Sequence, residues 1–166
     1  PTHDKLDATL TPNIYRWKEH SIHFPRVYNI FPGTTRSHIS LGTGGHSASW
    51  GSPIELLDYS FKGPKLPDAL IKNRLNSWGL KEEYILDEIN QWMDAYNEDD
   101  PFFLQFLTSC THHPYSTPDD YVNPFGTDDE ISRYNNAIHY TDHIIGKLIQ
   151  KLEEKGILEN TVIAIT

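Results

Sequence analysis

Residues 131–166 read ISRYNNAIHYTDHIIGKLIQKLEEKGILENTVIAIT and contain the two kinds of element that decide the fold class. Gly156 is expected to end a helix, because glycine readily adopts the left-handed conformation of a helix cap. The β-branched run TVIAIT at 161–166 then predicts a strand. Apolar side chains at alternating steps of three and four residues predict the long amphipathic helix itself; they are Ile131, Tyr134, Ile138, Thr141, Ile145, Leu148 and Leu152.

Helices and apolar strands also alternate in the rest of the chain. Residues 101–107, PFFLQFL, form a short apolar run that predicts a buried strand. Residues 81–96 predict an amphipathic helix with Tyr84, Ile85, Ile89 and Trp92 on its apolar side. This alternation predicts a layered α/β domain with a mostly parallel sheet. The other expected elements are a helix over 12–20 with Thr11 as N-cap, a strand over 21–30 broken at Pro25, and helices over 34–43 and 65–72.

Composition limits the function classes. The 166 residues suggest a single domain over 1–166, and their net charge of −9, with no run of Lys or Arg, argues against a nucleic-acid partner. Cys110 is the only cysteine, so neither an internal disulfide nor a CxxC metal motif is expected. No apolar stretch approaches the ~20 residues that span a bilayer, so membrane association is expected only through parts absent from this chain.

The segment Gly33-Thr34-Thr35-Arg36-Ser37 is a candidate anion site. A glycine followed by hydroxyls at the start of a helix places free N–H groups and the positive end of the helix dipole beside a ligand. A threonine hydroxyl there is a candidate nucleophile where a metal lowers its pKa, and Arg36 could hold a charged oxygen. The alternative is that Thr34 only caps the helix.

Two adjacent histidines follow the predicted strand over 101–107. Ligands of parallel α/β sheets bind beyond the carboxyl ends of the strands, which is where Thr111-His112-His113-Pro114-Tyr115 lies. Neighbouring side chains of an extended segment point to opposite sides, so one histidine is expected at a site and the other outside it. The alternative is that both are solvated loop histidines.

Three other patterns are weaker candidates. His139 and His143 have the i, i+4 spacing of metal ligands on a helix, but the HExxH glutamate is missing, so a solvated helix face is expected instead. The acidic runs at 98–100 and 128–130 are typical of loop ends and helix starts. The tryptophans, Trp78 included, are scattered and are expected in the core or at its rim.

Several of these segments, in this order and spacing, resemble the sulfatase/alkaline-phosphatase superfamily, nearest to its lipoteichoic-acid-synthase-like and phosphoethanolamine-transferase-like branch. The resemblance implies a three-layer, alkaline-phosphatase-like α/β fold. It also implies phosphoryl or phosphodiester transfer or hydrolysis on an anionic ester, such as a lipid or cell-envelope glycan headgroup. The matching segments are Thr11-Pro12-Asn13, Gly33–Ser37 reaching Thr43-Gly44, Trp78-Gly79-Leu80, Pro101–Leu104, Thr111–Tyr115 and residues 134–166.

The resemblance assigns roles residue by residue. Counting back from Thr43-Gly44 makes Thr34 the catalytic nucleophile and a metal ligand, with Thr35 as the alternative nucleophile. Arg36, Ser37 and His112 would bind the substrate, a phosphate or sulfate ester. The expected cofactor is a divalent metal, Zn or Mn first, with Ca or Mg as alternatives. An extracytoplasmic location, periplasmic or at the cell surface, is also implied.

Two departures from the family pattern modify these expectations. Formylglycine-type sulfatases oxidise Cys or Ser in their nucleophile motif, and threonine cannot be converted in this way. A sulfuric-ester hydrolase is therefore the alternative enzyme, behind phosphoryl transfer. The chain also starts after the family's first acidic metal ligand and stops before its Asp-His pair. It is therefore expected to be an incomplete piece of a larger catalytic domain, inactive by itself. A degenerate, non-catalytic binding module is the other alternative.

Overall fold

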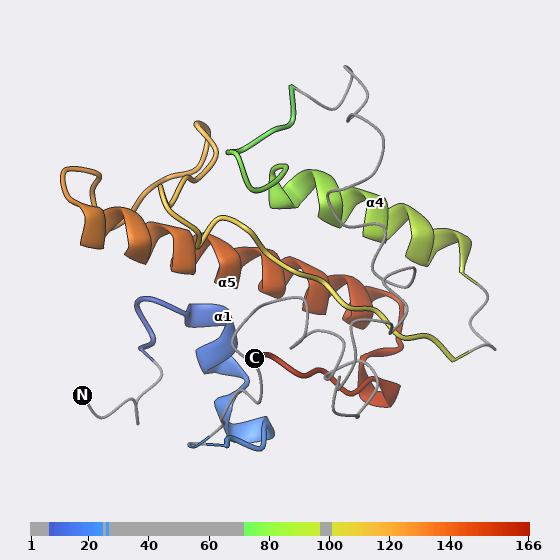
Figure 1. Ribbon diagram of the computed structural model, residues 1–166. Helices are drawn as coiled ribbons and strands as arrows, with labels where there is room; N and C mark the ends of the chain where they lie inside the picture. Colours follow the sequence, from blue (N-terminus) through green and yellow to red (C-terminus); the bar gives the residue numbers. More distant parts are fainter. Residues whose placement is uncertain (1–6, 25, 27–71, 97–100) are drawn as a thin grey trace, which may run out of the picture. The chain divides into compact units, whose positions relative to one another are not determined.

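The computed structural model describes residues 7–24, 26, 72–96 and 101–166 (Figure 1). The chain divides into two compact units, Pro1–His23 with Lys72–Thr166, and Phe24–Ile71. All described helices belong to the first unit. None of them combines the length and apolar character that crossing a membrane requires. The helical elements, in chain order, are α1 (Pro12–Arg16), η1 (Lys18–His20), α4 (Glu82–Ala95), α5 (Glu130–Glu154) and η3 (Leu158–Asn160).

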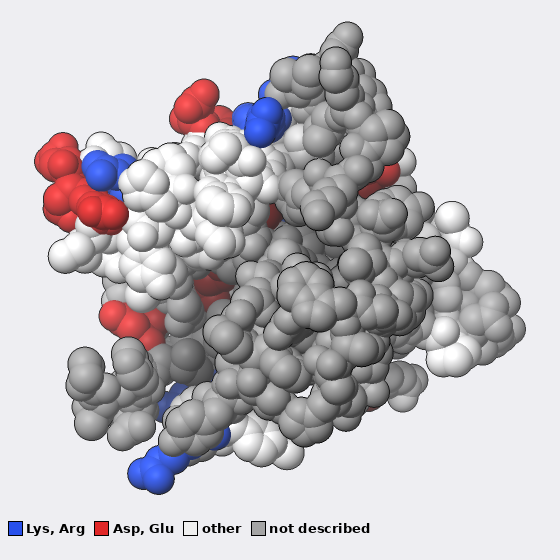
Figure 2. Space-filling model, viewed as in Figure 1, with Lys and Arg blue, Asp and Glu red and all other residues white. Residues whose placement is uncertain are grey.

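The long predicted helix is confirmed as α5, and both of its ends follow from the sequence. Asp129 is the N-cap and accepts a hydrogen bond of 2.8 Å from the backbone N–H of Ser132. Acidic side chains gather at this end (left in Figure 2), where the helix dipole favours negative charge. At the other end Gly156 has φ 71° and donates to Glu153 O, while the next N–H donates to Leu152 O. This is the Schellman pattern, so the predicted stop at Gly156 is confirmed.

The buried face of α5 differs from the predicted one. Ala137, Tyr140 and Ile144 are fully buried, one position before the predicted Ile138, Thr141 and Ile145. Ile131 and Tyr134 were expected on the apolar face, but they are 74% and 42% exposed. The reason is that Asn136 and Asp142 are buried with hydrogen-bond partners, which a count of apolar residues assigns to solvent.

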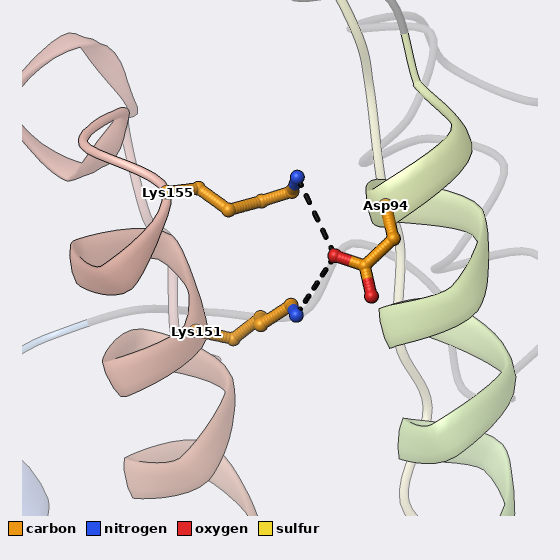
Figure 3. Close-up of polar contacts among 3 residues, drawn as sticks. All are labelled: Asp94, Lys151 and Lys155. Atoms are coloured by element: carbon orange, nitrogen blue, oxygen red, sulfur yellow. Dashed lines mark ion pairs between the residues drawn. The ribbon is translucent and has the colours of Figure 1, made fainter.

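Helix α4 confirms the helix predicted over 81–96 and lies beside α5 (Figure 1). Its buried residues are Glu82, Leu86 and Met93, whereas Trp92, expected on the apolar side, is 43% exposed. Near its C-terminal end, Asp94 forms ion pairs with two lysines of the α5 end, Lys151 at 2.8 Å and Lys155 at 3.5 Å (Figure 3). Lys151, mainly through its hydrogen bond, lowers the pKa of Asp94. Since Asp94 is exposed, these ion pairs contribute little to the stability of the fold.

Helix α1 begins at Pro12, as predicted, but its cap is not the predicted one. Thr11 occupies the N-cap position without a side-chain capping bond. The carboxylate of Asp142 on α5 accepts from the backbone N–H groups of Asn13 at 2.9 Å and Ile14 at 2.8 Å. A distant carboxylate therefore satisfies the free donors of the first turn. The predicted helix over 12–20 is divided into α1 and η1 at Trp17.

The core connects α4, α5 and the segment that precedes the two histidines. Apolar side chains from these three parts exclude water together, which is the main source of stability in such a small cluster. Partly buried residues that include Phe106, Tyr115 and Leu148 pack around it. The fully enclosed members are Leu86, Cys110, Ala137, Tyr140 and Ile144.

The predicted sheet stays a prediction. Within the described residues no strand ladder is formed, and the one isolated bridge joins Arg74 and Leu80. Strands need partners for their N–H and C=O groups, and the segments at 101–107 and 161–166 have no ladder partner in that part of the chain. Phe103, in the run that predicts a buried strand, is 74% exposed, and Val162 in the run at 161–166 is 97% exposed. The predicted helix over 34–43, all but the last residue of the predicted helix over 65–72, and most of the strand over 21–30 lie outside the described residues.

Candidate functional site

A closed turn over residues 73–81, which we call the Trp78 turn, forms one side of the site. Its ends are joined by the Lys81 N–H, which donates to the carbonyl of Asn73 at 2.7 Å. Inside the turn, the Asn76 side-chain oxygen accepts from the N–H groups of Trp78 at 2.8 Å and Gly79 at 3.2 Å. Asparagine side chains commonly close turns in this way. The turn therefore holds Trp78 in a defined position.

The other side is the loop over residues 109–119, called here the histidine loop. The N–H of His112 donates to Ser109 O at 3.1 Å, and the N–H of Tyr115 donates to His112 O at 2.7 Å. Tyr115 has φ 62°, a left-handed conformation that is uncommon for a residue with a side chain and concentrates at functional sites. Its ring packs edge-on against Tyr134 of α5, with centroids 5.1 Å apart. The loop is thus held by its own backbone and by α5.

The two sides meet where the rings of Trp78 and His112 stack. Their centroids are 4.5 Å apart and their planes differ by 17°. The indole N–H of Trp78 also donates to the carbonyl of His113 at 3.0 Å. Trp78 is 50% exposed and His112 is exposed, so the stacked pair is accessible to a ligand. The imidazole of His112 can donate a hydrogen bond to an anionic oxygen, and the indole of Trp78 provides a flat apolar face beside it.

A buried carboxylate fixes the start of the histidine loop. Glu82, at the start of α4, has no exposed surface, and its Oε1 accepts from the N–H groups of Ser109 and Cys110, both at 2.8 Å. The Ser109 hydroxyl also donates to this oxygen at 3.2 Å. Three donors on Oε1 offset part of the cost of burying the carboxylate, whose other oxygen has no hydrogen-bond partner in the described residues. Glu82 therefore ties the Trp78 turn, which ends beside it, to the loop that carries His112.

Cys110 is a packing residue in this arrangement. It is fully buried, and its Sγ lies 3.0 Å from the Thr141 hydroxyl. Burial, with a smaller contribution from the charge of Glu82, raises the pKa of the thiol to about 12. Because the thiolate is the reactive form of cysteine, this thiol is unsuited to nucleophilic chemistry.

His139 and His143 do not form the solvated face expected for them. Both are partly buried, and the Tyr121 hydroxyl lies 2.6 Å from His139 Nδ1. Burial, and then the charge of Lys147, lowers the pKa of His143. Within the described residues, no group of three or more His, Cys, Asp or Glu side chains is placed to hold a metal ion.

Of the predicted site residues, the structure describes His112. It places His112 beside Trp78, while His113 turns its ring to Tyr115 at 5.7 Å. The expectation of one histidine at the site and one outside it stays a prediction. Trp78 was expected in the core or at its rim; the signal that it lies at the site is its place in a Trp-Gly turn directly before a helix. The predicted nucleophile segment, Thr34, Thr35, Arg36 and Ser37, lies outside the described residues, as does Thr34 as a metal ligand.

Comparison with known proteins identifies the family. The sequence model of the sulfatase family matches residues 54–166, more than half of the chain. The chain belongs to the sulfatase family. The Trp78 turn and the histidine loop both lie within the matched residues. Family membership implies an alkaline-phosphatase-like α/β fold and a hydrolase or transferase, of a kind that generally uses divalent metal ions.

Similarity to one curated relative is more specific than the family match. The lipoteichoic acid synthase-like protein YvgJ of Bacillus subtilis (strain 168) is 29% identical over 90 residues. The match covers 52% of this chain and 14% of that protein, so the chain spans a small part of its relative. No solved structure matches the chain. The chain is thus a sulfatase-family member with lipoteichoic acid synthase-like neighbours.

Proposed function

We propose that this protein catalyses phosphoryl or phosphodiester transfer or hydrolysis on an anionic ester, such as a lipid or cell-envelope glycan headgroup. Thr34 is the proposed nucleophile, with Thr35 as its alternative, and Arg36 and Ser37 bind the charged group. His112 completes the substrate site. The proposal is supported by the sulfatase-family match together with the similarity to a lipoteichoic acid synthase-like protein.

The single observation in the structure that favours this proposal is the exposed stack of His112 on Trp78. An imidazole N–H can donate to a phosphoryl oxygen, and the indole face can cover the apolar part of the esterified alcohol. The hydrogen bond from Trp78 Nε1 to His113 O keeps the two rings in register. The pair therefore suits an ester with a charged head and a carbon-rich alcohol.

Cys110 favours phosphate esters over sulfate esters. A formylglycine-type sulfatase needs an oxidisable Cys or Ser at the nucleophile position, whereas the predicted nucleophiles here are threonines. Cys110 is fully buried, and its side chain contacts Thr141 in the core. Its thiol pKa is raised to about 12, so it keeps its proton at physiological pH. Cys110 therefore does not replace the oxidisable Cys or Ser that a formylglycine-type sulfatase needs.

The proposal includes a divalent metal ion, zinc or manganese first, and an extracytoplasmic location. When bound, such an ion would lower the pKa of a threonine hydroxyl. The described residues do not by themselves make its site, since they hold no group of three or more candidate ligands. Thr34 is the ligand proposed from the chain itself. Loss of turnover on chelation, restored by zinc or manganese, would support this part.

The decisive experiment measures turnover of a chromogenic phosphodiester and of an aryl sulfate by the longest natural form of the protein. We expect turnover of the diester to exceed that of the sulfate, and Thr34→Ala to abolish it while Thr35→Ala retains it. The reverse pattern would transfer the nucleophile role to Thr35. Faster turnover of the sulfate would overturn the substrate class. If the metal-loaded protein turns over neither substrate, and neither threonine variant changes this, the protein is a non-catalytic module.

A further inference from the structure

A cleft of about 540 Å³ opens between the base of the Trp78 turn, the histidine loop and the first turns of α5. Neither Trp78 nor His112 lines it, so it is separate from the stacked pair. Its volume falls within the roughly 300–1,000 Å³ of typical small-molecule sites. The Trp78 turn and the histidine loop are each closed by their own backbone hydrogen bonds, and Asn123 and Thr127, between the loop and α5, complete the lining.

Three cationic side chains line this cleft against one carboxylate. Arg74 and Lys81 come from the two ends of the Trp78 turn, Arg133 comes from α5, and the carboxylate belongs to Asp119. The cleft is thus positive in a chain whose net charge is −9. By contrast, the groove of about 330 Å³ between α4 and α5 mixes both signs, with Glu83, Asp87 and Glu154 opposing its lysines.

None of the three cations forms an ion pair with a carboxylate within the described residues. The ion pairs found there all involve Asp94, at the far end of α4. Arg74 donates from Nε and Nη2 to the carbonyls of Asn76 and Ser77, and Arg133 donates from Nη1 to that of Thr127. A guanidinium has five N–H donors, so each arginine is braced by its own loop and keeps donors for a ligand.

Arg133 lies one turn after the acidic start of α5, where Asp129 is the N-cap and Glu130 the first helical residue. The pKa of Asp129 is lowered mainly by hydrogen bonds from Ser132, and the charge of Arg133 is a minor cause. Asp129 does not line the cleft, and its carboxylate is already used as the N-cap of α5. The charge of Arg133 is therefore available to the cleft.

Neutral hydrogen-bonding groups complete the lining. The Thr117 hydroxyl donates to Asn123 Oδ1 at 2.9 Å, an arrangement that leaves the amide N–H₂ of Asn123 as the donor available to a ligand. Charge-assisted bonds from guanidinium and ammonium groups are the usual way in which proteins hold phosphate oxygens. Cations and amide donors around one concave space match an oxyanion better than a neutral or cationic ligand.

We propose that this cleft is a second anion-binding site, which takes the phosphate group of a phosphate ester or inorganic phosphate. It is distinct from the site at His112 and does not depend on the proposed chemistry at Thr34. Arg133 and Lys81 supply the charge, Arg74 flanks it, and Asn123 adds a neutral donor. Asp119 is the one carboxylate among the described residues of the lining and opposes this positive charge.

The test titrates the longest natural form of the protein with inorganic phosphate and, separately, with glycerol phosphate, and follows backbone amide signals of residues 114–127 by NMR. We expect saturable shifts with both probes. Lys81→Gln and Arg133→Gln should each weaken binding roughly tenfold, the loss expected for one charge-assisted bond. Arg133→Lys keeps the charge and should restore most of the affinity. Lys147→Gln, which removes a charge from the mixed groove instead, should leave the affinity unchanged.

The two probes distinguish the sources of the phosphate. Tighter binding of glycerol phosphate than of inorganic phosphate would support an ester as the occupant, whereas the opposite order would support the free ion. The proposal is overturned if no saturable shift occurs, or if Lys81→Gln and Arg133→Gln bind as the unmodified protein does. It is also overturned if His112→Ala alone abolishes the shifts, because the anion would then sit at the stacked pair.

Discussion

Asp142 and Asn13 are joined by two hydrogen bonds although they lie 129 residues apart in the chain. One carboxylate oxygen of Asp142 accepts both the backbone N–H and the side-chain amide of Asn13, each at 2.9 Å, and the other accepts from Ile14. The carboxylate is 1% exposed. A buried charge on α5 therefore serves as the N-terminal cap of α1, which the Thr11 side chain does not provide.

Replacing this carboxylate should release α1. In Asp142→Asn one oxygen becomes an N–H₂ group that faces a donor, so at least one donor of α1 loses its partner. We expect the free energy of unfolding to fall by about 3 kcal/mol. Amide hydrogen exchange should show lost protection at Asn13 and Ile14. Asp128→Asn, an exposed change beside the α5 cap, is the control, and equal exchange in both variants would refute the capping role.

The contact between α1 and α5 also explains a glycine in the middle of α5. A Cβ at Gly146 would lie 2.5 Å from two atoms of the Asn13 side chain, whose position is fixed by Asp142. Gly146→Ala should therefore destabilise the protein, despite the gain of about 1 kcal/mol that alanine brings within a helix. In an Asn13→Ala background the clash disappears and the same change should stabilise. Additive effects in this double-mutant cycle would contradict the explanation.

Glu82 shows which parts of the site periodicity predicts and which it misses. Both α4 and α5 follow from apolar spacing, and the Gly156 stop of α5 follows from glycine alone. Apart from Leu152, which is buried as predicted, their buried apolar residues lie one position from the predicted ones, because Glu82, Asn136 and Asp142 are polar residues that are buried with hydrogen-bond partners outside their own helices. The histidine loop was located from a strand followed by two histidines. Its contact with Trp78 required tertiary structure, since a Trp-Gly pair does not specify what the indole stacks upon.

The three bonds to Glu82 predict a graded response to substitution. Glu82→Gln can keep the accepting oxygen, because the other carboxylate oxygen has no hydrogen-bond partner in the described residues. We expect it to cost about 1 kcal/mol, and Glu82→Leu, which strands three donors, about 3 kcal/mol or more. Denaturant unfolding measures both. Equal losses would show that the packing of the side chain, and not its hydrogen bonds, holds the histidine loop.

Buried acidic groups predict a loss of stability at alkaline pH. The pKa of Cys110 is raised to about 12 by burial and then by Glu82, that of Tyr121 to about 12 by burial and then by Asp142, and that of Tyr140 is raised by burial. Each folded-state pKa exceeds the unfolded one. The stability that these protonated groups contribute to the folded protein is fully present below their unfolded pKa values and is lost as pH rises toward 12.

Cys110 gives this prediction a matched control. An unfolded thiol with a pKa near 9 loses its proton by pH 10, so the folded protein should lose about 1 kcal/mol from this group between pH 8 and pH 10. In Cys110→Ala the residue no longer titrates, and the fall in stability over the same range should be smaller by that amount. Identical pH profiles for the two proteins would show that the thiol ionises alike in both states.

The stack of Trp78 on His112 predicts different kinetic effects for its two members. If His112 donates to charge that develops in the transition state, His112→Ala should lower kcat roughly 10²–10³-fold, as removal of other such donors does. Trp78→Phe keeps an aromatic face but loses the hydrogen bond to His113, whereas Trp78→Ala loses both. We therefore expect activity to fall modestly in the first and further in the second, mainly through KM if the indole binds the alcohol. An unchanged rate in His112→Ala would remove this histidine from the substrate site, and the stack would then be a structural contact that closes the loop.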